Sequence, residues 1–268
     1  MPPGIELEEL NNNNNVIRQN EQSLSLRVND LETNDARAVF KNINIDMLQF
    51  KKLRMFIHAE NYNTADPSGT EYPFDERDLS AFLRMGNDLT NNYYQVEVPL
   101  NPSPNNTRIA NEVWPSENEI DLQLEALKKI KSSRIEAANF ATNIAYFDVN
   151  DDGSFVEYSG GIVNDLPITP IAEGIKYRIA IKGNPSLGSI RNLMLGVKNN
   201  SNTLRSGEVW FNELRLSDMD NKGGWAALLS ADANVADFAT VSASGKRSTI
   251  GFGSIEQGPN ERSRDDIK

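Results

Sequence analysis

Most of the chain alternates apolar and polar residues with a period of two, which is typical of half-buried β-strands. The clearest case is residues 175–182, where Ile175, Tyr177, Ile179 and Ile181 alternate with more polar neighbours. Asn, Asp, Gly and Pro cluster between the segments and favour turns. The pattern predicts an antiparallel β-sandwich. Its expected strands lie near 24–28, 43–47, 53–57, 79–85, 94–98, 144–149, 175–181, 193–197 and 209–216.

One segment departs from this period and indicates a helix. Ser116 and Glu119 have the spacing of a capping box, in which each side chain satisfies a backbone N–H of the first turn. Apolar residues then recur at helical spacing at Ile120, Leu124, Leu127 and Ile130. We therefore expect one inserted α-helix over about 117–137, packed against a face or an end of the sandwich.

The two ends of the chain differ from this middle. Residues 1–22 are acidic and contain five consecutive asparagines, Asn11–Asn15. Such a segment buries too little apolar surface to offset its ordering entropy, so it predicts a flexible arm. We accordingly assign residues 23–220 to the sandwich.

The C-terminal segment, residues 221–268, alternates in a different way. After Gly223 and Gly224 the residues on one face are small and apolar, and those on the other are mostly polar. The apolar set is Ala227, Leu229, Ala231, Ala233, Val235, Val241, Ala243 and Gly245. A strand with lipid on one side and a wet lumen on the other needs this pattern. Because an open sheet edge is not tolerated in lipid, the segment is expected to be a β-hairpin belonging to a transmembrane barrel wall in a larger protein.

Composition excludes several classes of function. The formal net charge of −11 argues against a nucleic-acid partner, because phosphate binding needs a basic surface. The chain has no cysteine and one histidine, so disulfides, thiolate chemistry and a zinc enzyme are not expected. No apolar run is long enough for a transmembrane helix, and Met1–Gly4 does not begin a signal peptide.

Residues 148–153 carry oxygen-bearing side chains at alternate positions, Asp148, Asn150 and Asp152, followed by Gly153. This is how an EF-hand calcium loop begins, although Ser159 stands where that loop needs a bidentate glutamate. The same residues favour a hairpin turn, since Asn, Asp and Gly tolerate positive φ. Both interpretations stay open, and no metal or cofactor is assigned.

No catalytic residue is assigned either. Glu208 and Glu213 are five residues apart on one expected strand, so their side chains should not form the facing pair of a glycosidase. His58 ends an apolar strand, without a nucleophile motif such as G-x-S-x-G in the chain. We expect it to be a structural or edge histidine.

A group of aromatic residues could form a binding surface. Exposed rings beside loops can stack on sugars or contact a partner chain, and the alternative is packing in the core or under loops. Alternation places Tyr93 and Tyr94 on opposite faces, so one of them should be buried. The group consists of Tyr62, Tyr72, Tyr93, Tyr94 and Trp114.

Four segments of the chain carry a resemblance to a known family. They are Asn20–Leu31, Asp35–Glu60, Trp114-Pro115 and Gly207–Arg264. They resemble the SprA/Sov family, the outer-membrane translocon of the type IX secretion system and of gliding motility in Bacteroidetes. Residues 46–60, 78–100 and 207–218 are also similar to jelly-roll sandwiches of carbohydrate-binding and galactose-binding-like domains, a likeness of fold that does not fix function.

The resemblance implies a non-enzymatic structural domain of a protein-secretion translocon, located at the outer membrane or cell surface. It implies as partners a lateral partner barrel, a periplasmic plug and secreted cargo. The alternative is a carbohydrate-binding jelly-roll module of a surface protein, which the aromatic group would serve. A hydrolase is a third class, and the lack of a paired-carboxylate or triad arrangement counts against it.

Overall fold

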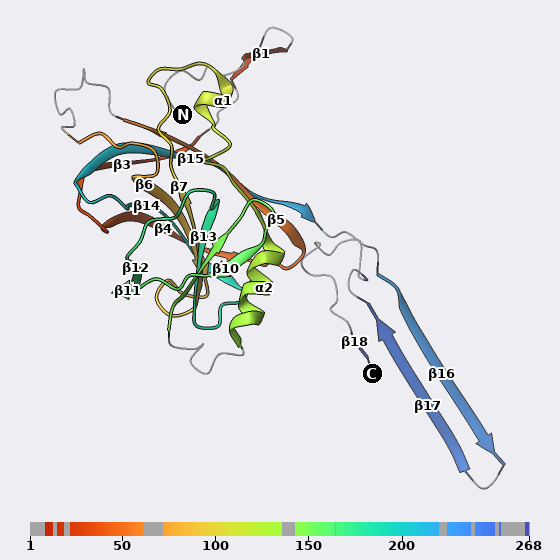
Figure 1. Cartoon of the computed structure of the whole chain (residues 1–268). Helices are drawn as coiled ribbons and strands as arrows, with labels where there is room; N and C mark the ends of the chain where they lie inside the picture. The colour runs from red at the N-terminus through yellow and green to blue at the C-terminus, as the bar shows by residue number, and fades with distance from the viewer. Residues whose placement is uncertain are drawn as a thin grey trace. The chain divides into compact units, whose positions relative to one another are not determined.

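The computed structural model describes residues 9–12, 15–18, 22–61, 72–135, 143–163, 165–219, 224–236, 239–249, 252 and 266–267 (Figure 1). The chain divides into two compact units, Met1–Ser217 and Asp218–Lys268. Each unit is described below by itself.

The larger unit is built on two antiparallel sheets, which confirms the expected mainly β, sandwich-like fold. One sheet has seven strands in the order β10-β9-β13-β7-β6-β14-β4 and the other has four in the order β3-β15-β5-β8. The first contains β4 (Ala36–Ile45), β6 (Leu79–Gly86), β7 (Tyr93–Pro99), β9 (Ala145–Val149), β10 (Phe155–Glu157), β13 (Tyr177–Lys182) and β14 (Ile190–Asn199). The second contains β3 (Leu24–Leu31), β5 (Phe50–Glu60), β8 (Ile120–Gln123) and β15 (Arg205–Met219).

The core lies between the inner faces of these sheets. On the seven-stranded sheet, the register aligns Leu195, Leu83, Val96, Ile179 and Phe147 across five neighbouring strands. On the other sheet, β5 contributes Leu53, Met55 and Ile57 at alternate positions, each about 1% exposed. The alternation read from the sequence therefore selects the inward residues on both sheets.

The outer face of the seven-stranded sheet is also buried over its central strands, which the sequence did not predict, whereas Phe40 at the β4 end is 66% exposed. All seven residues of β7 are buried, including the polar residues Gln95 and Glu97. The segment 165–172 is hydrogen-bonded to this face, where Tyr146 Oη donates to the carbonyl of Asp165 at 2.6 Å and Arg178 Nη1 to that of Thr169 at 2.6 Å. The charged residues on this face pair with one another, as Glu97 does with Lys198 at 3.6 Å.

The expected helix is present but begins later than predicted. Helix α2 spans Leu124–Ile135, and the preceding Ile120–Gln123 form strand β8 instead of the first helical turn. The capping box does not form, because Glu119 pairs with Arg54 at 2.8 Å. Pairing with the edge of β5 satisfies the backbone of 120–123 and buries Ile120 and Leu122, so tertiary structure overrides the local helical signal. The predicted residues 136–137 lie outside the described residues.

Shorter elements complete this unit. A one-turn helix, α1 (Ala110–Val113), precedes β8, and the strands β11 (Ile162–Val163) and β12 (Leu166–Pro167) form a small ladder. In the segment predicted to be a flexible arm, β1 (Glu9–Asn12) pairs with β2 (Asn15–Arg18), and the remaining residues up to 21 lie outside the described residues. Across the described part of the chain, no helix is long and apolar enough to cross a membrane.

The smaller unit contains a long hairpin. Strand β16 (Ala226–Val235) pairs antiparallel with β17 (Ala239–Ser248) over ten residue pairs, and β18 (Asp266–Ile267) pairs with the end of β17. The boundary between the two units lies between Ser217 and Asp218, three residues before the boundary expected from the sequence, which follows residue 220. Whether this hairpin belongs to a barrel wall stays a prediction.

The packing of α2 generates a test of the core. Leu127→Ala removes a side chain that is fully buried, so we expect a loss of about 2–5 kcal/mol in the free energy of unfolding. Lys129→Ala, on the exposed side of the same helix, should change it by no more than about 0.5 kcal/mol. Urea unfolding followed by circular dichroism measures both, and similar losses would contradict the packing of α2 described above.

Candidate binding pocket

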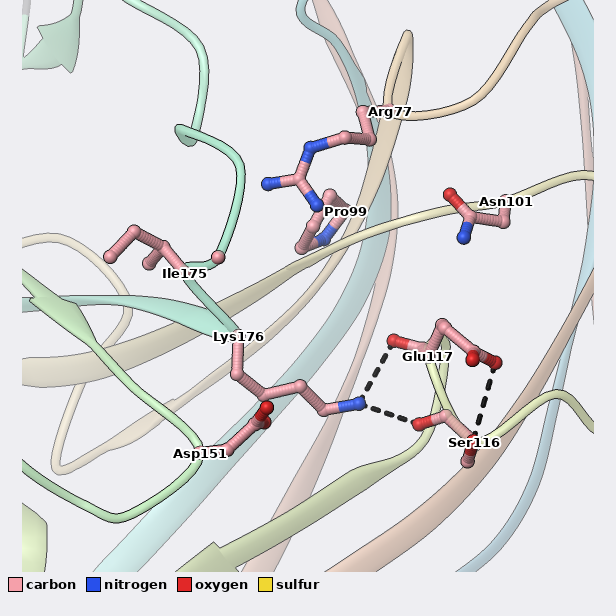
Figure 2. Close-up of a pocket in the computed structure, with 9 residues that line it drawn as sticks. Arg77, Pro99, Asn101, Ser116, Glu117, Asp151, Ile175 and Lys176 are labelled. Carbon is pink, nitrogen blue, oxygen red and sulfur yellow. Dashed lines mark hydrogen bonds between the residues drawn. The ribbon is translucent and has the colours of Figure 1, made fainter.

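A polar pocket of about 340 Å³ opens on the larger unit (Figure 2). Five separate segments meet there, so the pocket exists only in the folded chain. Its lining residues are Arg77, Pro99, Asn101, Ser116, Glu117, Asp151, Gly174, Ile175 and Lys176.

Lys176 forms one side of the pocket. Its backbone lies just before β13, where its N–H donates to the carbonyl of Val149 at 3.1 Å. Its Nζ donates to the carbonyls of Ser116 at 2.5 Å and Glu117 at 3.0 Å, which holds the 116–117 loop against the sheet (Figure 2). Burial lowers the pKa of the Lys176 ammonium below its ordinary value, and the nearby carboxylates of Asp151 and Glu117 oppose that shift.

Arg77 lies across the pocket from Lys176. It adopts φ of 66°, a left-handed conformation that is uncommon for a residue with a side chain. Its backbone N–H donates to the carbonyl of Leu100 at 2.8 Å. Its Nη2 donates to the carbonyls of Ile171 at 3.0 Å and Ala172 at 2.7 Å, so Arg77 ties the turn before β6 to the 171–172 segment.

A buried asparagine and a buried tyrosine hold the third side of the pocket. Asn118 is fully buried and exchanges two hydrogen bonds with the backbone of Asn101, at 2.8 and 2.9 Å. The hydroxyl of Tyr177 accepts from the N–H of Asp121 at 2.9 Å. Burial raises the pKa of Tyr177 to about 12. These contacts leave the Asn101 amide facing the pocket (Figure 2).

The lining suits a small polar ligand that carries both signs of charge. Arg77 and Lys176 supply two cations, Glu117 and Asp151 supply two carboxylates, and Asn101 supplies an amide. The hydroxyl of Ser116 donates to the Glu117 carboxylate at 3.3 Å. None of the nine lining residues is a histidine. A second pocket, of about 550 Å³, shares Arg77 and extends toward Asn200 and Arg205.

The calcium-loop residues are engaged with other protein groups. Both carboxylate oxygens of Asp148 accept from Arg178, at 2.7 and 3.0 Å. Asp152 accepts from the N–H and the hydroxyl of Ser154, at 2.8 and 2.6 Å, and Asn150 donates to that hydroxyl at 2.9 Å. Gly153 has φ of 80°, as a hairpin turn between β9 and β10 requires. Among the described residues, no cluster of three or more His, Cys, Asp or Glu could hold a metal ion.

The other polar candidates also have structural partners. His58 is buried, with Nδ1 2.6 Å from the carbonyl of Val113 and its ring against Trp210 at a centroid distance of 5.1 Å. Glu208 accepts from Arg27 at 2.9 Å, and Glu213 accepts from Arg215 at 3.1 Å. The two glutamates are therefore held in separate ion pairs.

The described members of the aromatic group do not form a shared surface. Tyr93 and Tyr94 point to opposite faces as predicted, and both are buried, since they are 3% and 1% exposed. Tyr94 lies in the main core, and Tyr93 packs with Tyr146 on the covered outer face. Trp114 packs against His58 and Phe56, whereas Tyr72 is 36% exposed. Tyr62 lies outside the described residues.

Sequence reasoning missed the pocket because its residues carry no local motif. Arg77 and Lys176 are about a hundred positions apart and each stands beside a turn, where charged residues are ordinary. The one available signal is Gly174, a turn residue just before the cleanest predicted strand.

The fold and the pocket together define a mainly β protein, in which a sandwich carries a polar pocket and a hairpin of the smaller unit exposes apolar residues. The chain belongs to the SprA_N family, described as motility related/secretion protein, whose model matches residues 1–268. It is therefore part of a motility- or secretion-related protein of the cell envelope. The search of curated proteins found no match.

Tyr177 gives the pocket region a pH dependence. Because the folded state raises its pKa from 10.0 to about 12, its contribution to stability is complete below about pH 10 and declines as pH rises toward 12. We expect the difference in unfolding free energy between the wild type and Tyr177→Phe to fall by up to about 1.4 kcal/mol per pH unit in that window. Urea unfolding at pH 8, 10 and 11 measures it. A difference that does not depend on pH would contradict the raised pKa.

Proposed function

We propose that this chain is a non-enzymatic structural part of the outer-membrane translocon for type IX secretion and gliding motility in Bacteroidetes. The hairpin of the smaller unit supplies two strands to the wall of a transmembrane barrel, and the sandwich is a rigid domain outside the lipid. Family membership supports the secretion role. The arrangement of the hairpin supports the barrel.

The observation that carries the proposal is the register of β16 and β17. It pairs Leu229 with Gly245, Ala231 with Ala243 and Ala233 with Val241, so the small apolar residues of both strands share one face. It pairs Ser230 with Ser244, Asp232 with Ser242 and Asn234 with Thr240 on the other face. The two strands thus agree on which side would meet lipid and which would meet water. The exceptions stand near the open end of the hairpin, where Arg247 lies on the apolar face and Leu228 on the polar face.

The dimensions and exposure of the hairpin also fit a membrane wall. Each strand has ten residues, the length of a tilted strand that crosses a bilayer. Leu229 and Val241 on the apolar face are 76% and 57% exposed. Trp225 stands just before β16 and is 52% exposed, where an aromatic girdle residue would lie.

The sandwich suits a scaffolding role at the mouth of a pore. Segment 165–172, hydrogen-bonded over the middle of the outer face, helps to make it a stiff body. Recognition residues are usually placed on the loops of such a rigid body. In this proposal the polar pocket and the loops around it contact other translocon subunits or exported cargo.

A pair of neighbouring substitutions tests the proposal in the full-length protein in cells. Ala231→Arg places a charge in the middle of the apolar face, where lipid contact costs about 2–4 kcal/mol. Ser230→Arg places the same charge on the polar face one residue away. We expect Ala231→Arg to reduce outer-membrane assembly and cargo secretion, and Ser230→Arg to leave both near the wild-type level.

The isolated chain provides the control for folding. There, both substitutions should leave the unfolding midpoint of the sandwich unchanged, because the two positions lie in the other unit. Equal effects of the two variants in cells, or a greater effect of Ser230→Arg, would exclude the assignment of this face to lipid.

A further inference from the structure

Strand β4 is the last strand of the seven-stranded sheet, so one of its edges has no strand partner among the described residues. It has ten residues, more than the other terminal strands β10, β3 and β8. Its unpaired backbone N–H and C=O groups form a row that an added strand can use.

Among the described residues, this edge has few of the usual protections against strand addition. Proteins shield sheet edges with proline, short strands, bulges, charged side chains or a covering loop, and of these β4 has the charged Arg37 and Lys41 and one irregularity in register. β4 contains no proline or glycine, and its pairing with β14 is regular over seven residues, from Ala36 to Asn42. The irregularity in register lies beyond them, between Asn42 and Ile45. Phe40 is 66% exposed and Val39 is 41% exposed, which is high for apolar residues in a sheet.

The edge is also basic in an acidic chain. The three strands at this end of the sheet, β4, β14 and β6, contain no aspartate or glutamate, whereas the whole chain has a net charge of −11. Lys41 and Arg191 are exposed there. Arg37 has a side chain that is 64% exposed and pairs with Asp35, an exposed contact that is worth little and is easily exchanged.

The alternation of β4 determines which of its charged and apolar side chains share a face. Arg37, Val39 and Lys41 share the face that carries Leu195 of β14, which is the inner face of the sheet, and all three are exposed at this edge. An apolar residue thus stands between two cations, and Phe40 points to the opposite face. Residues directly opposite one another on paired strands have Cβ atoms about 5 Å apart. A partner strand with carboxylates two positions to either side of an apolar residue matches this face.

We propose that β4 is a docking edge for an extended acidic segment of a partner protein, which adds as an eighth strand to the sheet. Backbone hydrogen bonds between β4 and the added strand supply the affinity, as in other cases of strand addition. The side chains of Arg37, Val39 and Lys41 make the edge specific for an acidic sequence. A second copy of this chain fits less well. Antiparallel self-pairing centred on Val39 places Arg37 opposite Lys41 of the copy, and like charges directly opposite one another are destabilising.

The test uses the whole chain and two synthetic peptides of about nine residues. The acidic peptide has a central Val with Glu two positions away on each side, and Thr or Ser elsewhere. The basic peptide has Lys in place of both Glu. Fluorescence anisotropy measures binding, and amide hydrogen exchange measured by NMR locates it. We expect the acidic peptide to bind more tightly and to slow exchange in residues 36–42.

Two substitutions with the same change of charge give the matched comparison. Lys41→Glu should weaken binding of the acidic peptide by about tenfold or more, since it puts a carboxylate opposite a carboxylate. Lys51→Glu, exposed on β5 in the other sheet, should change binding by less than about twofold. Thermal unfolding of both variants checks that they are folded.

Several results would overturn the proposal. Equal binding of the two peptides, equal losses for Lys41→Glu and Lys51→Glu, or exchange protection outside residues 36–42 would each do so. A concentration-dependent dimer in sedimentation that protects the same residues would assign the edge to a second copy instead.

Discussion

The ion pair between Arg178 and Asp148 organises one side of the larger unit. The two residues lie directly opposite one another on β13 and β9, and the Arg178 side chain is only 2% exposed. An unpaired charge at that depth would be costly, so the guanidinium is satisfied on every side. It binds Asp148, donates to the carbonyls of Thr169 and Pro170, and lies 4.4 Å from the ring centroid of Tyr158. The chain that covers the sheet is thereby fixed to it.

The pocket depends on the same arrangement. The segment that Arg178 holds continues to Ile171 and Ala172, which accept the hydrogen bonds of Arg77, and then to Lys176. The ion pair between Arg178 and Asp148, on β13 and β9, therefore helps to position Arg77 and Lys176, the two cations of the pocket. A polar network that is fully satisfied in this way acts as a rigid frame.

Sequence patterns predicted the sheet core well because each inward position depends mainly on local alternation. They failed where distant segments decide the outcome. The residues 120–123 have helical spacing but pair with β5, and Tyr93, on the outer face, is buried in a cluster with Ile144, Tyr146 and Ala180. The pocket could not be found for the same reason, since Arg77 and Lys176 become neighbours only through folding. The hairpin was the easier case, because its two strands are consecutive in the chain and each shows its alternation locally.

Arg77 shows how such a position limits sequence change. Its left-handed backbone would be relieved by glycine, at a gain of about 1 kcal/mol in conformational strain. Glycine, however, would leave the carbonyls of Ile171 and Ala172 without their donor. Lysine could reach them with a single ammonium but lacks the flat fork that serves two acceptors at once. Arginine therefore keeps both hydrogen bonds at the cost of a strained backbone, and no residue type meets both demands. Substitution at this turn should be restricted in the same way as substitution in the core.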